Sequence, residues 1–317
     1  YHEYLFLFIL NISKACDTFR VAGLFFNIFS GVFKMNRTVK ILSAILSVAL
    51  TAALFAGCGG KSTAELIVED GVLTVAMECA YAPYNWTQSD DSNGAVPIKD
   101  SNDYANGYDI MMAKKICEAN NWKLEVVRLD WDSLVPAVQT GQVDATIAGQ
   151  SMTADRMQQV DFAGPYLYAS IVCMAKQDSK YASATKLSDL SGGKCTSQLG
   201  TIWYDTCLPQ INGAKIQTAQ ETAPSMLMAL ETGAVDFICT DMPTAQGALL
   251  AYSDLKILDL EENSFKVDEG DINIGIAVKK GNTELKDKIN AVLKDMTEDD
   301  FNSIMAEATK IQPLAEK

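Results

Sequence analysis

Apolar and polar side chains alternate with two different periods between residues 71 and 148. Three short, mostly apolar runs are typical of buried strands, and the segments between them have apolar side chains three and four positions apart, which predicts helices. The expected strands are residues 71–77, 123–129 and 143–148, and the expected helices are residues 107–120 and 131–141. This order predicts an α/β unit whose ligands bind at the carboxyl ends of the parallel strands.

The loop after the first expected strand is rich in aromatic residues. It spans residues 78–86, and Pro83 within it prevents regular structure. Aromatic side chains at the end of a strand fit the wall of a ligand site, and a local hydrophobic cluster is an equally good interpretation. Residues 87–106 are polar and rich in Asp, Asn, Ser and Gly. We expect a surface insertion there, with a hairpin through residues 95–98 as one option.

The third expected strand leads into a candidate anion site. Gly149 breaks the strand, and both Ser151 and Thr153 are good N-cap residues for a following helix. The start of a helix offers free backbone N–H groups and the positive end of a dipole. Arg156 lies one turn further on and carries a planar fork that suits a carboxylate. The segment predicts a carboxylate receptor, with a surface arginine after an ordinary turn as the alternative.

The hydrophobic pattern continues through the second half of the chain. Extended apolar runs alternate with amphipathic segments, which predicts further strands and helices of the same α/β kind. The expected strands lie within residues 168–175, 194–203, 233–243, 255–260 and 271–278, and the expected helices lie within residues 187–193, 221–230, 285–293 and 298–308.

The N-terminal region has the layout of an export signal. Residues 35–40 supply a basic start, and residues 41–56 are almost wholly apolar and small. We therefore expect a signal peptide over residues 35–57. The alternative is an uncleaved single membrane anchor.

A lipid attachment site is expected at the end of this signal. Residues 54–58 resemble a bacterial lipoprotein box, although Phe55 stands where leucine is usual, so we expect lipidation of Cys58. Residues 58–65 are polar and contain glycine, which fits a tether. We interpret residues 1–34, which begin with Tyr1 and precede a complete signal, as upstream sequence that the cellular protein lacks. An additional membrane segment is the alternative.

Composition excludes several classes of function. The 317 residues suit two lobes, and 48% hydrophobic with 21% charged residues is ordinary for a globular protein. The net charge is −14; residues 1–57 hold five Lys or Arg and two Asp or Glu, so their removal leaves about −17. This acidity argues against nucleic-acid binding. The only histidine, His2, lies in the removed segment, so a Ser-His or Cys-His nucleophile and a histidine metal site are excluded.

The cysteines give little positive information. None of those after Cys58 forms a Cys-x-x-Cys pair, which argues against a zinc or thioredoxin-like site. Several lie in apolar runs and resemble small core residues. Cys195 and Cys207 are the closest pair in sequence, and the pairing of any disulfide stays open.

Six segments in order resemble the family 3 extracellular solute-binding proteins, which are the polar amino-acid receptors of ABC importers. The resemblance extends from about Leu66 to about Ile311. The segments are residues 80–84 (Ala-Tyr-Ala-Pro-Tyr), 107–110 (Gly-Tyr-Asp-Ile), 131–137 (Trp-Asp-Ser-Leu-Val-Pro-Ala), 141–145 (Gly-Gln-Val-Asp-Ala), 151–156 (Ser-Met-Thr-Ala-Asp-Arg) and 160–166 (Val-Asp-Phe-Ala-Gly-Pro-Tyr).

The resemblance implies a two-lobed, periplasmic-binding-protein-like α/β fold. Each lobe would be a mixed sheet flanked by helices, and two crossing strands, within residues 168–175 and 271–278, would join the lobes. Residues 66–169 with 275–317 would form the first lobe, and residues 170–274 the second.

The resemblance also implies a set of binding residues in the first lobe. Arg156 would hold the α-carboxylate of the ligand, assisted by Ser151 and the backbone near Gly149. Tyr81 and Trp131 match aromatic positions that sandwich the ligand side chain. Glu78 matches an acidic position near its far end.

The second lobe would complete the site. Gly200 and Thr201 resemble a helix start that also touches the carboxylate, and Asp241 matches an aspartate that pairs with the ligand ammonium. A capping or turn aspartate is the alternative for Asp241. Trp203 departs from the polar residues usual in the family, and we favour a core position over one that crowds the pocket.

Three classes of function follow. The first is a monomeric receptor, lipid-anchored on the outer face of the bacterial plasma membrane or periplasmic, that delivers a polar amino acid to the membrane subunits of an ABC importer. It needs no cofactor, metal or catalytic residue. The second is an enzyme on the same fold, such as a cyclohexadienyl dehydratase. The third is an amino-acid sensor domain.

Overall fold

The structure is a computed structural model that describes residues 68, 71–261 and 264–313. The upstream segment, the signal peptide, the lipidation at Cys58 and the tether all fall outside these residues, so they remain predictions. Within the described residues, no helix is both long enough and apolar enough to span a bilayer.

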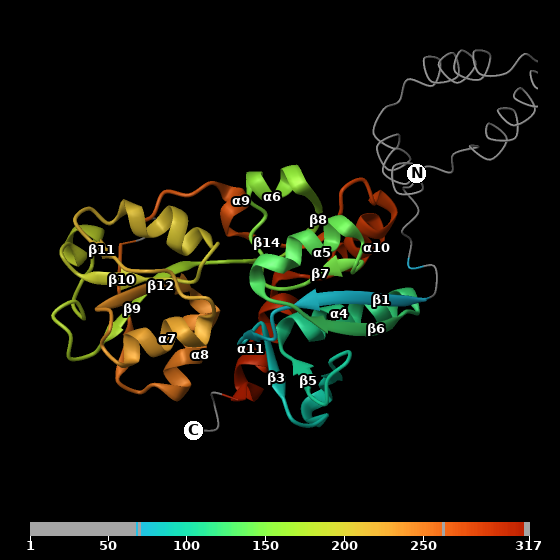
Figure 1. Ribbon diagram of the computed structural model, residues 1–317, viewed down its shortest axis with the longest axis horizontal. Coiled ribbons are helices and arrows are strands. Elements are labelled where there is room, and N and C mark those ends of the chain that lie inside the picture. The colour runs from blue at the N-terminus through green and yellow to red at the C-terminus, as the bar shows by residue number, and fades with distance from the viewer. Residues whose placement is uncertain (1–67, 69–70, 262–263, 314–317) are drawn as a thin grey trace, which may run out of the picture. The chain divides into compact units, whose positions relative to one another are not determined.

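The first lobe is built on a five-stranded mixed sheet with the order β6-β1-β7-β14-β8 (Figure 1). Strands β1, β6 and β7 are parallel, as the sequence predicted, and β14 runs antiparallel to β7 and β8. The strands are β1 (Val72–Met77), β6 (Lys123–Arg128), β7 (Ala145–Thr146), β8 (Val160–Tyr168) and β14 (Asn273–Lys279). The helices that connect the parallel strands are α4 (Tyr108–Asn120) and α5 (Leu134–Thr140), the latter preceded by the 3-10 turn η2 (Trp131–Ser133).

Residues 87–106, the expected surface insertion, contribute two strands and the end of a third to a second, smaller sheet. Its strands have the order β2-β3-β5-β4, and Ile98 and Ala105 are buried. Residues 89–94 are exposed, as expected of a surface insertion, and the hairpin at residues 95–98 exists as β4 pairing with β5, but the segment also contributes buried side chains. The elements are β2 (Ala80–Tyr81), β3 (Asn85–Gln88), the 3-10 turn η1 (Ser92–Gly94), β4 (Val96–Pro97) and β5 (Tyr104–Asn106).

The second lobe contains another five-stranded mixed sheet, with the order β11-β10-β12-β9-β13 (Figure 1). Strands β10, β11 and β12 are parallel, and β9 is antiparallel to β12 and β13. The strands are β9 (Ile171–Lys176), β10 (Lys194–Thr196), β11 (Lys215–Ile216), β12 (Phe237–Asp241) and β13 (Leu255–Ile257). The helical segments are η3 (Leu187–Leu190), the π-helix η4 (Trp203–Cys207), η5 (Leu208–Gln210), α7 (Ala223–Glu231) and α8 (Met242–Ala251).

The two sheets are connected by adjacent stretches of chain. Strand β8 ends at Tyr168 and β9 begins at Ile171, so the expected first crossing strand is two strands with a break between them. The return passes through α9 (Glu269–Ile272) before β14 begins. The backbone N–H of Ala169 donates to the carbonyl of Ile272 at 2.7 Å. The two connections are thus hydrogen-bonded to each other.

The last two helices do not both belong to the first lobe alone. Helix α10 (Thr283–Lys294) packs on β8 and α4. Helix α11 (Glu298–Ile311) contacts α4 and also α8 of the second lobe. Just after α11, the buried Gln312 side chain lies so close to Gly247 of α8 that a Cβ there would be 2.8 Å from it. Helix α11, which the sequence analysis assigned to the first lobe, therefore also contacts the second lobe.

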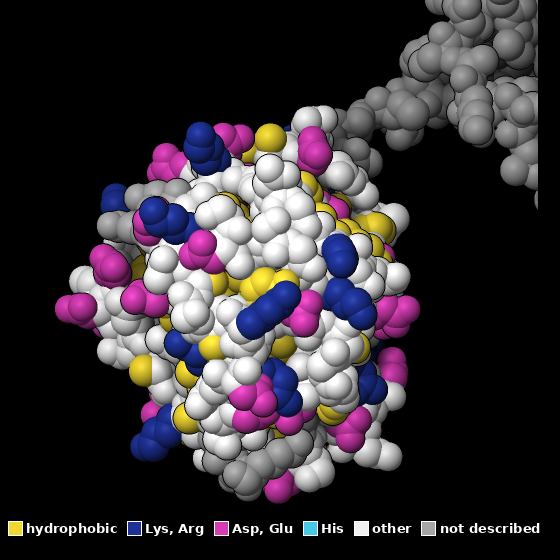
Figure 2. All heavy atoms as spheres, turned by 90° about the vertical axis from the view of Figure 1, so that its left-hand side faces the viewer, with side chains coloured by type: hydrophobic (Ala, Val, Ile, Leu, Met, Phe, Trp, Pro, Cys, Tyr) yellow, Lys and Arg dark blue, Asp and Glu magenta, His cyan; other side chains and the backbone are white. Residues whose placement is uncertain are grey.

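The surface of the second lobe carries charges of both signs. Figure 2 views the molecule from the left-hand side of Figure 1, where this lobe lies, and acidic and basic side chains are interspersed over that face. The net charge of −14 is thus not expressed there as a continuous acidic surface.

Candidate ligand-binding site

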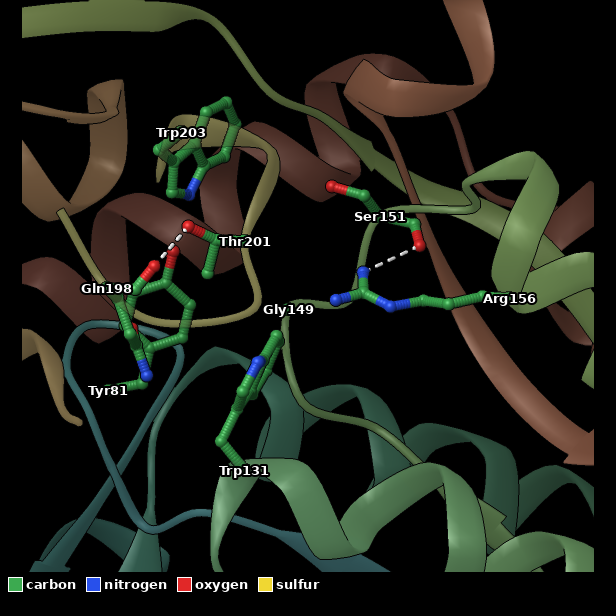
Figure 3. A pocket seen from close by; sticks show the side chains of 8 residues that line it. All are labelled: Tyr81, Trp131, Gly149, Ser151, Arg156, Gln198, Thr201 and Trp203. Carbon is green, nitrogen blue, oxygen red and sulfur yellow. Dashed lines mark hydrogen bonds between the residues drawn. The ribbon is translucent and has the colours of Figure 1, made fainter. Parts of the chain in front are cut away.

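A pocket lies where the strand ends of the two lobes meet. Its free volume is about 10 Å³, roughly the space that one water molecule needs, and it is lined by Tyr81, Trp131, Gly149, Ser151, Arg156, Gln198, Thr201 and Trp203 (Figure 3). The first five follow strands β1, β6 and β7, and the last three follow β10. The pocket thus forms at the carboxyl ends of parallel strands, where open α/β sheets bind ligands. It brings together six of the nine predicted binding residues.

Arg156 extends from the short helix α6 (Ala154–Gln159) into this pocket (Figure 3). The hydroxyl of Thr153 caps the helix by accepting from the Arg156 backbone N–H at 3.3 Å. The guanidinium donates from Nη1 to the Ser151 carbonyl and from Nη2 to the Gly200 carbonyl, each at 3.0 Å. Its central carbon lies 5.3 Å from the centroid of the Trp131 ring.

The Arg156 side chain is half-buried, and its guanidinium has no anionic partner among the described residues. In the described part of the chain, no carboxylate lies within ion-pair distance of Arg156. Burial lowers the pKa of the guanidinium to about 10, and the more distant Asp205 and Asp271 partly oppose this shift. A buried charge that meets only neutral carbonyls is costly. An incoming anion would relieve that cost.

Gly149 occupies a position that only glycine fits. Its φ is +64°, and a Cβ there would lie 2.9 Å from Cε1 of Tyr81. Its N–H donates to the hydroxyl of Tyr166 at 3.1 Å, which leaves this N–H engaged within the protein. Ser151 is buried and forms a bridge to Ile274 in β14.

Two tyrosines join the aromatic loop of the first lobe to Asp241 of the second. The rings of Tyr81 and Tyr84 stack with centroids 4.6 Å apart. The hydroxyl of Tyr81 donates to Oδ2 of Asp241, and the hydroxyl of Tyr84 donates to Oδ1 at 3.2 Å. The loop thus has both features that the sequence suggested: Tyr81 lines a pocket, and Tyr84 is fully buried in a hydrophobic cluster.

Asp241 does not line the pocket directly. It is the last residue of β12 and the N-cap of α8, and it accepts from the Thr244 backbone N–H and hydroxyl at 2.9 Å each. The capping interpretation thus describes its contacts within the chain. The phenol of Tyr81 separates its carboxylate from the pocket.

Glu78 lies beside the pocket and contacts the opposite lobe. Its side chain is only 7% exposed. Burial raises the pKa of its carboxyl to about 7, a hydrogen bond from Gln198 opposes that shift, and the negative charges of Asp130 and Asp132 add to it. Nε2 of Gln198 donates to Oε2 of Glu78 at 3.1 Å.

Gln198 was missed by sequence reasoning. The signal that could have found it is its place between β10 and the predicted Gly200–Thr201 turn, at the carboxyl end of a parallel strand. Its side chain lines the pocket, and its carbonyl accepts from the Thr201 hydroxyl at 2.7 Å.

The Gly200 turn differs from the expected anion site. Gly200 adopts φ +65° and presents its carbonyl, not its N–H, to Arg156 and to Nε1 of Trp131, at 3.0 and 3.4 Å. The turn leads into the five-residue π-helix instead of a regular α-helix. Trp203 is buried, as we favoured, and it also lines the pocket.

The remaining chemistry candidates lie outside the pocket. The six cysteines in the described residues are all buried and free, so Cys195 and Cys207 do not form a disulfide. No group of side chains among the described residues is arranged to hold a metal ion.

Comparison with known proteins decides the family. The family model for bacterial extracellular solute-binding proteins, family 3, matches residues 73–308. The chain belongs to this family. The match covers both lobes and every residue that lines the pocket of this solute-binding protein.

Relatives with names and solved structures agree. The solute-binding protein is 27% identical to a probable histidine-binding protein of Neisseria gonorrhoeae over 265 residues, which are 83% of this chain and 92% of the relative. It is similar to the amino acid ABC transporter substrate-binding protein AbpA of Streptococcus pneumoniae bound to L-arginine, with a TM-score of 0.67, 25% identity, and 80% and 100% of the two chains covered. It also resembles AncCDT-1, an ancestral amino-acid-binding protein described as a precursor of cyclohexadienyl dehydratase, with a TM-score of 0.63, 28% identity, and 78% and 100% coverage.

Proposed function

We propose that this solute-binding protein encloses one free amino acid between its lobes and delivers it to the membrane subunits of an ABC importer. The observation that carries the proposal is Arg156, a half-buried guanidinium at the pocket whose hydrogen-bond partners in the described chain are neutral carbonyls. The α-carboxylate of an amino acid would supply the missing charge in a bidentate geometry. Ser151 lines the same pocket, and its hydroxyl would donate to that carboxylate; Thr201 lines the pocket too, but its hydroxyl already donates to the Gln198 carbonyl at 2.7 Å.

The ligand ammonium is assigned to the side of the pocket where Tyr81 covers Asp241. The carboxylate of Asp241 is fully buried and held by neutral donors. A shift of the Tyr81 phenol would open it to a cation, which it would stabilise more strongly than a hydroxyl does. Tyr81 and Trp131 would then flank the ligand side chain.

The far end of the site favours a cationic side chain. Glu78 is buried, and Asp130 and Asp132 add negative potential at its carboxyl. A guanidinium, ammonium or imidazolium group would offset the cost of ionising Glu78 in this place. The ligands for which one relative and one structural neighbour are named, histidine and L-arginine, fit this class.

The cellular arrangement is the second part of the proposal. A signal over residues 35–57 and a lipid on Cys58 would hold a monomeric receptor at the outer face of the membrane, and membership of an extracellular family supports export. We assign residues 66–169 with 275–317 to the first lobe and residues 170–274 to the second; the strands of the two sheets support this division, except that β14 of the first sheet already begins at Asn273.

A dehydratase-like enzyme is the second candidate. The observation that favours it is the raised pKa of Glu78, because a buried acid that titrates near 7 can act as a general acid. The resemblance to AncCDT-1 is compatible with either function. Incubation of the purified protein with prephenate and chromatographic detection of product would separate them, since a receptor leaves this substrate unchanged.

The primary test is a thermal-shift screen of the twenty amino acids followed by calorimetry. A ligand that binds only the folded protein raises the melting temperature. We expect the largest shift with a cationic amino acid and none with its α-amide, which lacks the carboxylate. A screen in which no amino acid raises the melting temperature would refute the proposal.

A further inference from the structure

The buried carboxylate of Asp109 belongs to no function assigned so far. Asp109 is the second residue of α4, directly behind the pocket loop, and its side chain is 0% exposed. The backbone holds it against this loop: the Asp109 N–H donates to the Tyr84 carbonyl at 2.8 Å. Gly107 permits this close approach, because a Cβ there would lie 2.3 Å from the Tyr84 carbonyl oxygen.

Two neutral side chains donate to the two oxygens of this carboxylate. The hydroxyl of Tyr166 donates to Oδ1 at 2.6 Å, and Nδ2 of Asn85 donates to Oδ2 at 2.7 Å. No cation pairs with Asp109 in the described residues. Burial raises the pKa of the carboxyl to about 7, and these hydrogen bonds act in the opposite direction. A buried acid without a cation is costly for a fold to keep.

Each of these two donor side chains also accepts a hydrogen bond from a segment that forms a different wall of the pocket. The Tyr166 hydroxyl accepts from the N–H of Gly149, a lining residue, at 3.1 Å. Oδ1 of Asn85 accepts from the backbone N–H of Cys79 at 2.7 Å, and Cys79 lies between Glu78 and the lining residue Tyr81. The chain of contacts is therefore Gly149–Tyr166–Asp109–Asn85–Cys79.

We propose that Asp109 is a positioning residue for ligand binding, which ties the Gly149 segment and the Glu78–Tyr81 loop into one rigid half-site. It touches no ligand itself and acts through Tyr166 and Asn85. The two tied segments lead to Arg156 on one side and to Glu78 and Tyr81 on the other, so loss of the carboxylate loosens the spacing between the groups assigned to the two ends of the ligand. This inference rests on the proposed function.

The experiment compares ligand affinity with stability in matched variants. Asp109→Asn keeps the side-chain shape but places an amide N–H₂ opposite one of the two donors. Tyr166→Phe removes only the hydroxyl between Asp109 and Gly149. The matched control is Tyr108→Phe: Tyr108 is buried and stacks on Tyr166 at 5.6 Å, but its hydroxyl donates to the Tyr166 backbone carbonyl and not to the carboxylate.

Affinity is measured by calorimetry with the amino acid that the wild-type protein binds best. We expect Asp109→Asn and Tyr166→Phe each to weaken binding about tenfold, the size of one lost hydrogen bond. The double variant should be no weaker than either single one, because both break the same chain. Tyr108→Phe should lower the melting temperature and leave affinity within about twofold.

The possible outcomes distinguish a failure of the proposed function from a failure of the positioning role of Asp109. A wild-type protein that binds no amino acid would refute the proposed function before any variant is compared. Wild-type-like affinity in Asp109→Asn or Tyr166→Phe, or effects that add in the double variant, would overturn the positioning role. If Asp109→Asn fails to fold, the comparison of Tyr166→Phe with Tyr108→Phe decides, since equal affinity in these two also overturns it.

Discussion

Nε2 of Gln198 lies 3.1 Å from Oε2 of Glu78, so an amide of one lobe donates to a buried acid of the other. Burial raises the pKa of this acid to about 7. A neutral amide can stay beside either protonation state of Glu78, whereas a cationic ligand group favours the ionised state alone. The contact thus places a titratable acid at the junction of the two lobes.

Binding of a cationic amino acid should release a proton from Glu78. The free protein holds this carboxyl protonated below about pH 7, and a bound cation lowers its pKa, so affinity should rise between about pH 5 and 7 and level off above. Calorimetry at pH 6 in phosphate and in bis-Tris, which both buffer there and differ in ionisation enthalpy, measures the released proton directly.

Glu78→Gln is the control for this linkage. It should abolish the proton release and flatten the pH dependence, while also weakening the cationic ligand. Equal apparent enthalpies in the two buffers for the wild-type protein would show that Glu78 does not sense the ligand charge.

The buried carboxyl of Glu78 should also lower the free energy of unfolding at high pH. Because the folded-state pKa of Glu78 is raised from 4.5 to about 7, its favourable contribution is complete below about pH 4.5 and is lost as the pH rises through 7. The shift corresponds to about 3 kcal/mol. Glu78→Gln should therefore make the ligand-free protein more stable than wild type at pH 8 and leave it nearly unchanged at pH 5. Urea unfolding at the two pH values tests this, and a difference that does not grow with pH would contradict it.

The periodic pattern of apolar side chains was enough to predict most of the helices and strands of the two lobes. The alternation of β1, α4, β6, α5 and β7 was predicted because the two helices present regular apolar faces and β1 and β6 are continuous apolar runs. The small sheet of β2 to β5 was missed because its strands of two to four residues are too short and too polar to show a period.

The site was predicted less completely because its details are tertiary. That the Gly200 turn shows a carbonyl to Arg156 depends on the orientation of one peptide plane. That Asp241 is covered by two phenols depends on residues 157 and 160 positions away in the chain. Neither contact can be predicted from a pattern of neighbouring residues in the sequence.

Arg156→Ala should separate binding from stability. The ligand carboxylate would lose its charged partner, which should weaken binding by about 3–5 kcal/mol. The ligand-free protein should be no less stable than wild type, because the deleted cation is largely desolvated and has no ion pair in the described chain. Calorimetry and thermal unfolding measure the two effects. Affinity within a few-fold of wild type would show that the carboxylate binds elsewhere.

Gly149→Ala should damage the pocket beyond the backbone strain it introduces. A Cβ at Gly149 would lie 2.9 Å from the Tyr81 ring, so the ring must move away from its hydrogen bond with Asp241. Gly233→Ala is the matched control, since Gly233 has φ +74° and a Cβ there meets nothing within 4 Å. Both variants should lose about 1 kcal/mol of stability from the left-handed backbone, but only Gly149→Ala should also weaken ligand binding. Thermal unfolding and calorimetry on both variants give the comparison, and equal ligand affinity in the two would mean that the position of Tyr81 does not matter for binding.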